Sequence, residues 1–419
     1  MKEIHGRNLV RAIETFKAVN AAIVLIVLLL AGCGTTEMVE TSPTPPSTPT
    51  SVSTILPPTP LPTPTSKSTT PTSTTEVITS TPSTTTDEPA AATVPPVPDG
   101  LSLPPDYTIE LVVSDLRGPT QMIEGPDGRL WVAQLNGREN DGTGQLLAID
   151  LATGERQLLL ADLFKPTGLA LLEQTVWIAA GRDLLRAPLL DTGAIGPLET
   201  VLAELPFNGR SNGTLTVSPD GRLLFETSGR RSGNRASTGS ATLWALDPDA
   251  PDDPQPLATG LKGAYAHTFD SAGRLWTTEI GDDLVNGAAP PDELNWVIDG
   301  ADFGWPACFG QQEPALNFGG TEAQCQATRA PVVIFPPRST PTSIVASPWA
   351  DDVLLVALWG PSERTVGRIA VTVTGDNATG TYDVFLRGLQ TPQHLLVLPD
   401  QSLLVSDFSA GKIYQIRPR

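Results

Sequence analysis

PTQMIEGPDGRLWVA (119–133) is the first copy of a unit that recurs along the chain. Each copy starts near a Pro or a small residue, runs through an apolar strand, makes a turn and enters a second strand. The later copies are PTGLALLEQTVWIAA (166–180), SNGTLTVSPDGRLLFET (211–227), GAYAHTFDSAGRLWTTE (263–279), PTSIVASPWADDVLLVA (341–357) and PQHLLVLPDQSLLVSD (392–407). The period of about fifty residues carries strand and turn signals but no amphipathic helix pattern, and it predicts a β-propeller.

Six copies of the unit predict six blades. Equivalent second-strand positions in the copies are Trp131, Trp177, Leu224, Trp276, Leu355 and Leu404. The last blade ends one strand short, at GKIYQIRP (411–418), whereas the strand YTIELVV (107–113) precedes the first blade. Pairing these two segments would leave no open sheet edge. We therefore expect an all-β, six-bladed β-propeller over residues 98–419, closed by an N-terminal strand.

The repeat also predicts where a site would lie. In a four-stranded blade, the start of the innermost strand and the loop between the second and third strands emerge at the same mouth. The long loops of this kind are Leu135–Gly144, Ser228–Gly239, Gly281–Asp292 and Trp359–Val366. Because loops on a rigid scaffold are where sites are usually built, we expect the site at this mouth.

The N-terminal segment has the pattern of an export signal. Lys2, Arg7, Arg11 and Lys17 precede an apolar core at 21–30, which is too short to span a bilayer comfortably. LAGC (30–33) resembles the lipobox of bacterial lipoproteins, which implies a cleaved signal peptide at 1–32 and acylation of Cys33. An ordinary signal peptide with an unrelated Cys is the alternative. We expect a bacterial cell-envelope protein, lipid-anchored to the outer face of the cytoplasmic membrane or in the periplasm.

Residues 33–97 predict a disordered Pro/Ser/Thr-rich stalk. Between Thr41 and Ala90, 39 of 50 residues are Pro, Ser or Thr, and none is aromatic. Such a composition cannot bury enough apolar surface to offset the cost of ordering the chain, and dense Pro favours extended polyproline II. A Pro-rich motif that binds a partner is the alternative interpretation.

Cysteine content and net charge exclude several classes of binding partner. Apart from Cys33, the sequence contains only Cys308 and Cys325, which we expect to pair as a disulfide in an oxidising compartment. A metal site there is disfavoured because no His or third Cys lies nearby. With 46 acidic and 27 basic residues the net charge is −19, which argues against nucleic acid and against direct binding to anionic lipid. Membrane association is therefore expected through the lipid anchor only.

The segment LWTTEIGDDLVNGAAPPDELNWVIDGADFGWP (275–306) concentrates oxygen ligands. It runs from a short apolar strand into a loop rich in carboxylates, with no His or Cys in it. Asp282, Asp283, Asp292, Glu293 and Asn295 lie close together in this segment. Oxygen ligands suit a hard cation, Ca²⁺ before Mg²⁺, and disfavour zinc.

The same segment resembles the glucose/sorbosone dehydrogenase family, with LWTTEIGDD, PPDELN and GADFGWP as the sharpest matches. The likeness extends over roughly the whole propeller. It implies an oxidoreductase that holds pyrroloquinoline quinone (PQQ) beside Ca²⁺. Such an enzyme transfers hydride from an aldose or a sorbosone-type sugar to the quinone, and its partners are a sugar-like molecule and an electron acceptor.

The resemblance assigns roles to individual residues. Gly281 and Asp282 match loop positions that supply cation ligands, including backbone carbonyls. Asp292 and Glu293 match a motif that serves cation binding or braces the loop. Lys262 stands where relatives have an Arg that contacts the quinone; it keeps the charge but lacks the planar bidentate fork.

The family's catalytic His is absent. The matching position is Arg210, or Ser211 with a shift of one residue, and an Arg cannot act as a base. Arg210 is interpreted as an anion contact for a cofactor or substrate carboxylate, or as a rim Arg paired with an acidic neighbour. His394 is the candidate replacement base, and His267 is expected in the interior. The missing His leaves an alternative function, a catalytically degenerate propeller that binds a ligand or a protein partner.

Overall fold

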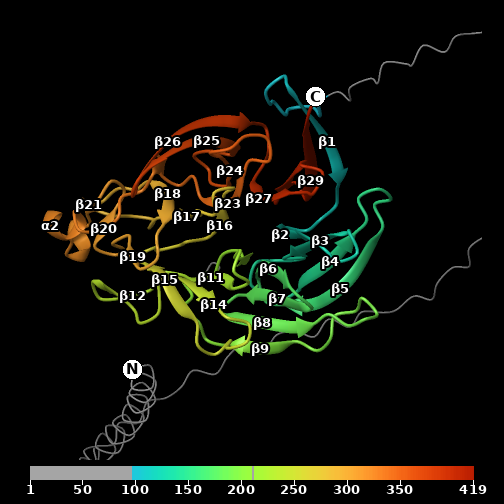
Figure 1. Cartoon of the computed structure of the whole chain (residues 1–419), viewed down its shortest axis with the longest axis horizontal. Coiled ribbons are helices and arrows are strands. Elements are labelled where there is room, and N and C mark those ends of the chain that lie inside the picture. The colour runs from blue at the N-terminus through green and yellow to red at the C-terminus, as the bar shows by residue number, and fades with distance from the viewer. Residues whose placement is uncertain (1–96, 210–211) are drawn as a thin grey trace, which may run out of the picture. The chain divides into compact units, whose positions relative to one another are not determined.

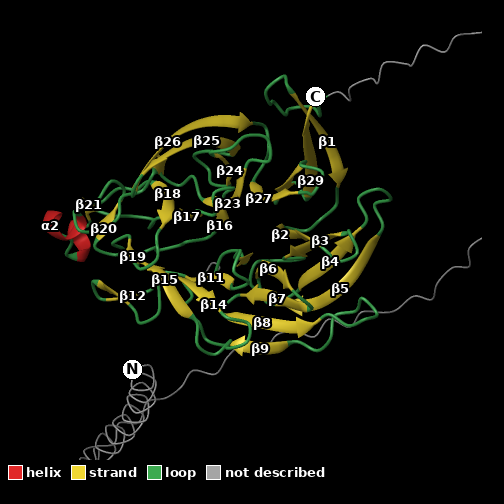
Figure 2. Cartoon of the chain, in the orientation of Figure 1, coloured by secondary structure: helices red, strands yellow, loops and turns green. Residues whose placement is uncertain are grey.

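The computed structural model describes residues 97–209 and 212–419. In this part of the chain, six sheets of at least four strands stand radially around a central axis (Figure 1). Strands and loops make up nearly all of it (Figure 2). The expected six-bladed β-propeller is confirmed. The predicted signal peptide, Cys33 and nearly all of the Pro/Ser/Thr-rich segment lie outside the described residues.

The first three blades follow one another along the chain. Blade one contains β2 (Pro119–Glu124), β3 (Leu130–Gln134), β4 (Gly144–Ile149) and β5 (Arg156–Leu163). Blade two contains β6 (Pro166–Leu172), β7 (Thr175–Ala180), β8 (Asp183–Pro188) and β9 (Glu199–Leu202). Blade three contains β10 (Thr216–Val217), β11 (Leu223–Thr227), β14 (Thr242–Leu246), β15 (Gln255–Thr259) and a parallel outer strand, β19 (Ala301–Asp302).

The other three blades complete the ring. Blade four contains β16 (His267–Phe269), β17 (Leu275–Glu279), β18 (Asp292–Val297) and β22 (Val333–Phe335). Blade five contains β23 (Pro341–Ala346), β24 (Val353–Leu358), β25 (Thr365–Thr374) and β26 (Asn377–Leu386). Blade six contains β27 (Pro392–Val397), β28 (Leu403–Asp407), β29 (Lys412–Pro418) and β1 (Tyr107–Val113).

Blade six closes the ring with strands from both ends of the domain. β1 pairs with β29 in antiparallel register, with Tyr107 opposite Pro418 and Ile109 opposite Ile416. The two isoleucines are fully buried in a core shared with blade five. The predicted closure is therefore confirmed, and β1 covers the outer edge of β29 as the fourth strand of blade six.

The second strand of each blade forms the core. All five residues of β3, β11, β17 and β28 are buried, because each strand has its own sheet on both sides and a neighbouring blade on each face. Trp131, Trp177 and Trp276, at equivalent places in the repeat, are at most 1% exposed. These rings therefore pack the blades together and take no part in a surface platform.

An insertion separates β18 from β22. It contains β20 (Cys308–Phe309), β21 (Glu313–Pro314), the 3₁₀ helix η1 (Leu316–Phe318) and helix α2 (Glu322–Cys325). Thr321 caps α2 by accepting a hydrogen bond from the Gln324 N–H. Cys308 and Cys325 are joined by a disulfide with an S–S distance of 2.01 Å, so the predicted pairing is confirmed. A short hairpin, β12 (Arg231–Ser232) with β13 (Arg235–Ala236), lies in the blade-three loop.

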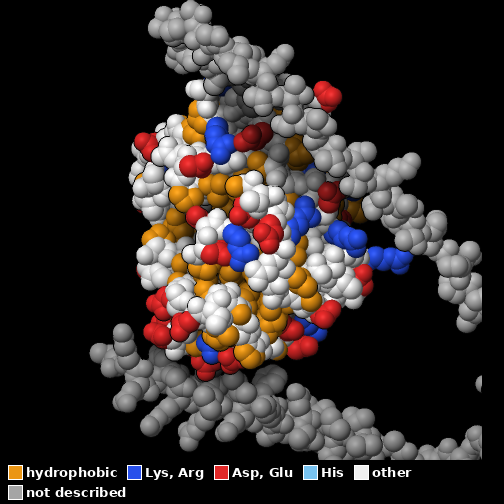
Figure 3. All heavy atoms as spheres, turned by 90° about the vertical axis from the view of Figure 1, so that its right-hand side faces the viewer, with side chains coloured by type: hydrophobic (Ala, Val, Ile, Leu, Met, Phe, Trp, Pro, Cys, Tyr) orange, Lys and Arg blue, Asp and Glu red, His pale blue; other side chains and the backbone are white. Residues whose placement is uncertain are grey.

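The surface carries mixed charge. On the face shown in Figure 3, Lys and Arg side chains are interspersed with Asp and Glu. Several exposed ion pairs have this character, among them Arg368 with Asp383 and Arg417 with Glu110. Such pairs contribute little to stability individually. Among the residues that the structure describes, no helix is long and apolar enough to cross a lipid bilayer.

Candidate functional site

The predicted mouth exists, and its loops contact one another between blades. Each contact starts at the loop between the second and third strands of one blade, or at a residue that bounds this loop. It ends on the segment that precedes the innermost strand of the next blade. These contacts join Glu139 to Lys165, Gly229 to Lys262, and Asp292 to Thr340. The mouth is therefore a ring of loops whose backbone is fixed by the neighbouring blade.

Lys262 is the central cation of the blade-three and blade-four side of the mouth. Its Nζ donates a 2.8 Å hydrogen bond to the carbonyl oxygen of Gly281. Its backbone N–H donates to Glu279 Oε1 at 2.8 Å, and its carbonyl oxygen accepts the Gly229 N–H at 2.6 Å. A Cβ on Gly229 would lie 3.0 Å from the Lys262 side chain and from the Trp305 ring, so glycine permits this close approach. Lys262 is thus held by two blades.

Asp292 braces the acidic loop. Its Oδ1 accepts the Gly281 N–H at 2.8 Å, and its Oδ2 accepts the Thr340 N–H at 2.7 Å. Burial raises the pKa of the carboxyl, and these backbone N–H groups oppose the rise. Both carboxylate oxygens are therefore committed to the backbone of blades four and five.

Glu279 and Glu293 form a buried carboxyl pair. They lie opposite each other in the β17–β18 register, and the Glu279 side chain donates a hydrogen bond to Glu293. Glu293 also accepts the Gly310 N–H at 2.7 Å and an Asn295 side-chain N–H at 3.2 Å. Burial raises the pKa of Glu293 to about 7, and burial together with the neighbouring carboxyl raises the pKa of Glu279 well above its usual range. The pair therefore retains a proton near neutral pH.

Glu226, on β11, is a third buried acid beside Lys262. Its carboxyl accepts hydrogen bonds from the backbone at Ala264 and Gly213. Burial raises its pKa to about 8, and the charge of Lys262 opposes that rise. Its Oε2 has no hydrogen-bond partner among the described residues. The charge of Lys262 acts in the same direction on Glu279 and Asp292, so one ammonium is shared by three buried carboxyls.

Asp282 faces away from this cluster, toward the blade-three hairpin. Its Oδ2 accepts hydrogen bonds from Arg231 Nη1 at 2.8 Å and from Trp305 Nε1 at 2.9 Å. The Arg231 guanidinium also lies 3.7 Å from the centre of the Phe318 ring. The Asp282 carboxylate therefore ties three loops together at the rim.

The predicted metal residues are thus close in space, but most of their side-chain oxygens already accept hydrogen bonds. Two predicted ligands already meet a cation: the Gly281 carbonyl oxygen contacts the ammonium of Lys262, and Asp282 contacts the guanidinium of Arg231. Among residues 97–209 and 212–419, no group of three or more His, Cys, Asp or Glu side chains is placed to hold a metal ion. A cation here would have to use backbone carbonyls, as the resemblance implies.

His394, the predicted base, and His267, expected in the interior, both lie inside the propeller. His394, on β27, is buried, and its Nδ1 accepts the Met122 N–H at 3.4 Å. His267, on β16, is also buried, and neither ring nitrogen has a partner in the described part of the chain. Burial lowers the pKa of each imidazole to about 3, so both are neutral. Arg210, predicted to contact an anion, lies outside the described residues.

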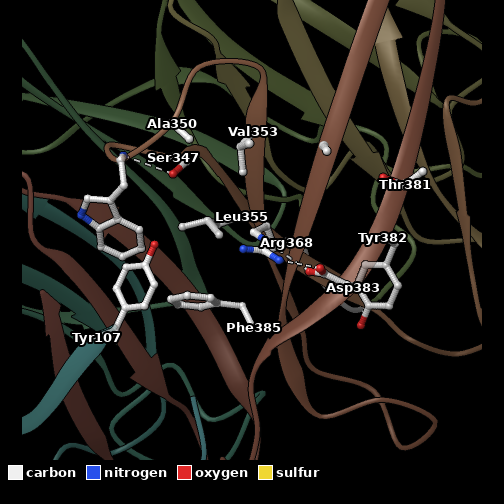
Figure 4. A pocket seen from close by; sticks show the side chains of 12 residues that line it. Tyr107, Ser347, Ala350, Val353, Leu355, Arg368, Thr381, Tyr382, Asp383 and Phe385 are labelled. Atoms are coloured by element: carbon white, nitrogen blue, oxygen red, sulfur yellow. Dashed lines mark hydrogen bonds and ion pairs between the residues drawn. The ribbon is translucent and has the colours of Figure 1, made fainter. Parts of the chain in front are cut away.

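A pocket of about 350 Å³ lies elsewhere, between blades five and six (Figure 4). Ser347 and Val353 in its lining flank the turn between the first two strands of blade five, which is at the end opposite the mouth. The rings of Tyr107 and Phe385 meet edge to face in it, with centres 5.0 Å apart. It is separate from the predicted site.

The sequence did not point to Glu226 or Glu279. Glu279 is the last residue of β17 and Glu226 the last but one of β11, where a single carboxylate resembles an exposed residue at a strand end. They do not occupy equivalent positions in the repeat, because the alignment of Leu224 with Trp276 places Glu226 opposite Thr278, one residue before Glu279. Comparison of the copies therefore gives no signal for this pair of acids.

The fold and the mouth define a six-bladed β-propeller whose rim holds an internal cation among buried acids. Residues 248–359, which contain Lys262 and the acidic loop, match the family model described as Glucose / Sorbosone dehydrogenase. This match confirms, over residues 248–359, the resemblance inferred from the sequence. No curated protein matches the chain.

Several solved structures share the fold. The holo form of the pyranose dehydrogenase PQQ domain from Coprinopsis cinerea has a TM-score of 0.62 at 16% identity and covers 77% of this chain and 98% of its own. The PQQ-bound aldose sugar dehydrogenase from Streptomyces coelicolor has a TM-score of 0.58 at 19% identity, covering 76% and 100%. A calcium structure of a Trichoderma reesei carbohydrate-active enzyme has a TM-score of 0.62 at 18% identity, covering 78% and 100%.

Proposed function

We propose that this protein is an extracytoplasmic oxidoreductase that transfers hydride from a sugar, an aldose or a sorbosone-type sugar, to PQQ bound at the mouth. The observation that supports this most is the position of the family match: residues 248–359 include Lys262 and Gly281, which meet at the mouth. The cofactors named for the solved relatives, PQQ and calcium, support the same proposal.

The chemistry of the mouth suits these cofactors. The donor set around Gly281 consists of carbonyl and carboxylate oxygens, which a hard cation such as Ca²⁺ prefers. Glu226 Oε2, buried and without a partner in the described residues, adds an unused oxygen nearby. Lys262 would pair with a carboxylate of the quinone, with Arg210 as the second cationic contact. When bound, the quinone supplies the acceptor for hydride.

His394 is the proposed base for the sugar hydroxyl proton. Its imidazole is neutral because burial lowers its pKa to about 3, and a base must be unprotonated. Because Nδ1 accepts the Met122 N–H, the neutral ring carries its proton on Nε2, so Nδ1 is the nitrogen that would accept the sugar proton after releasing that contact. Replacing His394 by Gln should abolish turnover and leave quinone affinity unchanged.

A second candidate function is a propeller that retains the cofactor or another ligand without catalysis. The observation that favours it is the burial of both described histidines, His267 and His394, together with the Arg or Ser at the family His position. A buried imidazole meets substrate only if the substrate reaches into the channel.

One experiment separates the two functions. Purified propeller is titrated with PQQ in excess Ca²⁺, and aldoses are then added with an artificial electron acceptor. Quinone binding with turnover supports the dehydrogenase, and binding without turnover supports the ligand-binding propeller. Absence of quinone binding at micromolar concentrations eliminates both cofactor-based proposals. Arg210→His is the follow-up variant, because gain of turnover would verify the alignment at that position.

We also propose that Cys33 carries the lipid anchor. The basic leader, the apolar core and LAGC (30–33) in that order support it. The full chain should fractionate with membranes and incorporate labelled fatty acid, and Cys33→Ser should lose both properties. Persistence of the label in Cys33→Ser would rule out this attachment site.

A further inference from the structure

We propose that the ammonium of Lys262 occupies the cation position at the Gly281 carbonyl in the ligand-free protein, so that a divalent cation binds there only by displacing it. This inference rests on the proposed function because it takes the cation site to be at Gly281. It does not depend on any reaction of the quinone. Lys262 then has two positions, on Gly281 before the metal binds and on an anionic group of the cofactor afterwards.

The first support is the orientation of the Gly281 peptide. Its N–H is held by Asp292 Oδ1 at 2.8 Å, and Asp292 is held in turn by the Thr340 N–H at 2.7 Å. With its amide fixed from one side, the Gly281 backbone presents its carbonyl oxygen to Lys262 Nζ, 2.8 Å away. The carbonyl is therefore a preformed oxygen ligand that an ammonium already uses.

The second support is the charge around the ammonium. Glu279 Oε1 accepts the Lys262 N–H at 2.8 Å, and the buried Asp292 accepts the N–H of Gly281, whose carbonyl oxygen Lys262 contacts. A buried carboxylate without a counter-ion is costly. The chain thus supplies from within the positive charge that a bound metal would otherwise supply.

The third support is an unused oxygen. Glu226 Oε2 is buried and has no hydrogen-bond partner in the described residues, although the carboxyl lies within the field of Lys262. Monodentate and bidentate carboxylates are ordinary Ca²⁺ ligands. The site therefore has acceptor capacity that one ammonium does not exhaust.

Two cations cannot share one carbonyl oxygen at this distance, because their repulsion in a partly buried site is strong. Removing the charge of Lys262 should therefore raise the affinity for Ca²⁺. It should also leave the buried Asp292 carboxylate without a cation nearby, which makes the protein's stability dependent on added metal.

The test uses CaCl₂ alone, without quinone, so that its result is independent of turnover. Calorimetric titration of the full chain is compared for wild type, Lys262→Met and the matched control Lys165→Met. Lys165 is also buried and also donates Nζ to a glycine carbonyl, that of Gly209, at 2.8 Å. We expect Lys262→Met to bind Ca²⁺ at least about tenfold more tightly than wild type, and Lys165→Met to bind it as wild type does.

Equal or weaker Ca²⁺ binding by Lys262→Met overturns the proposal, as does an equal gain in Lys165→Met. If Lys262→Met does not fold without metal, Lys262→Gln replaces it, since its amide can still donate to Gly281. Folding of either variant only with CaCl₂ supports the proposal. Failure of both to fold with or without CaCl₂ overturns it, because a metal then cannot take the place of the ammonium. Absence of quinone binding by wild type, with the Ca²⁺ effect of Lys262→Met retained, would reject the proposed function alone.

Discussion

Glu279 and Glu293 face each other across the β17–β18 pair and share a proton at the mouth of the propeller. Two buried carboxyls on opposite residues of neighbouring strands repel each other when both are ionised. The folded protein therefore keeps a proton that the unfolded chain releases. Together with Glu226, they link the stability of the metal-free protein to pH.

We expect metal-free protein to become less stable between pH 6.5 and 8.5. The folded pKa values of Glu293 and Glu226, about 7 and about 8, lie above the ordinary value of 4.5. Their stabilising contribution is therefore complete below the ordinary pKa and is lost as pH rises through the folded values. Urea unfolding measured across this range checks the sign, and stability that stays flat or rises would contradict it.

Glu226→Gln should remove part of this pH dependence. Glu226 alone accounts for a loss of about 2 kcal/mol over that range, because its folded pKa is about 8. Glutamine keeps one acceptor oxygen and does not titrate. Glu155→Gln, at an exposed turn, is the control and should keep the wild-type slope. A Glu226→Gln slope equal to that of wild type would show that this acid is not the source.

His267→Leu should stabilise the protein in acid. The imidazole is buried without partners in the described residues, and its folded pKa is about 3 against an ordinary 6.5. A histidine whose pKa is lower in the folded than in the unfolded protein decreases the free energy of unfolding as pH falls below the unfolded pKa. The decrease is about 2 kcal/mol at pH 5. Relative to wild type, the variant should therefore gain about this amount between pH 7.5 and pH 5. An equal difference at both pH values would argue that the imidazole is protonated inside the fold.

Asp292→Ala should destabilise the protein by about 2–4 kcal/mol. The substitution leaves the Gly281 and Thr340 N–H groups without their acceptor and frees the acidic loop. Asp292→Asn, which keeps one acceptor oxygen, should lose less. Chemical unfolding and hydrogen exchange of residues 281–292 measure the effect. Unchanged exchange in that segment would mean that Asp292 does not brace the loop.

Ile109→Asp should prevent stable ring closure. Ile109 is 1% exposed in β1, whereas Leu111, two positions along the same strand, is 45% exposed. A buried charge in blade six should cost more than about 3 kcal/mol, and the exposed β29 edge should promote aggregation. Leu111→Asp is the matched control and should behave as wild type in thermal unfolding and light scattering. An equal loss of thermal stability in both variants would contradict the burial of Ile109 in blade six.

Much of the fold follows from the repeat. Each of the six second-strand positions, from Trp131 to Leu404, lies in the second strand of its blade. The closing pair of β1 and β29 was also predictable, because a blade one strand short and an unmatched strand at the other end leave one solution without a free edge. The loops of the mouth followed from the same alignment.

The site was predictable as a neighbourhood but not as a set of contacts. The sequence placed Lys262, Gly281 and Asp292 at one mouth, and the structure joins them through 2.8 Å hydrogen bonds. The sequence could not show that Asp292 and Glu293 direct their oxygens to backbone N–H groups. A carboxylate that braces a loop and a carboxylate that binds a metal look the same in a sequence. Glu226 escaped notice because its partners lie on other parts of the mouth.

The amino-acid sequence by itself determined the number of blades, their order and their closure. Each copy of the repeat shows its own apolar strands and turns, so the blades can be counted one by one along the chain. Only the tertiary structure decided that the Lys262 ammonium, rather than a side chain of the acidic loop, faces the Gly281 carbonyl. That outcome depends on electrostatic balance among buried acids from two blades, and such a balance exists only after the blades have packed.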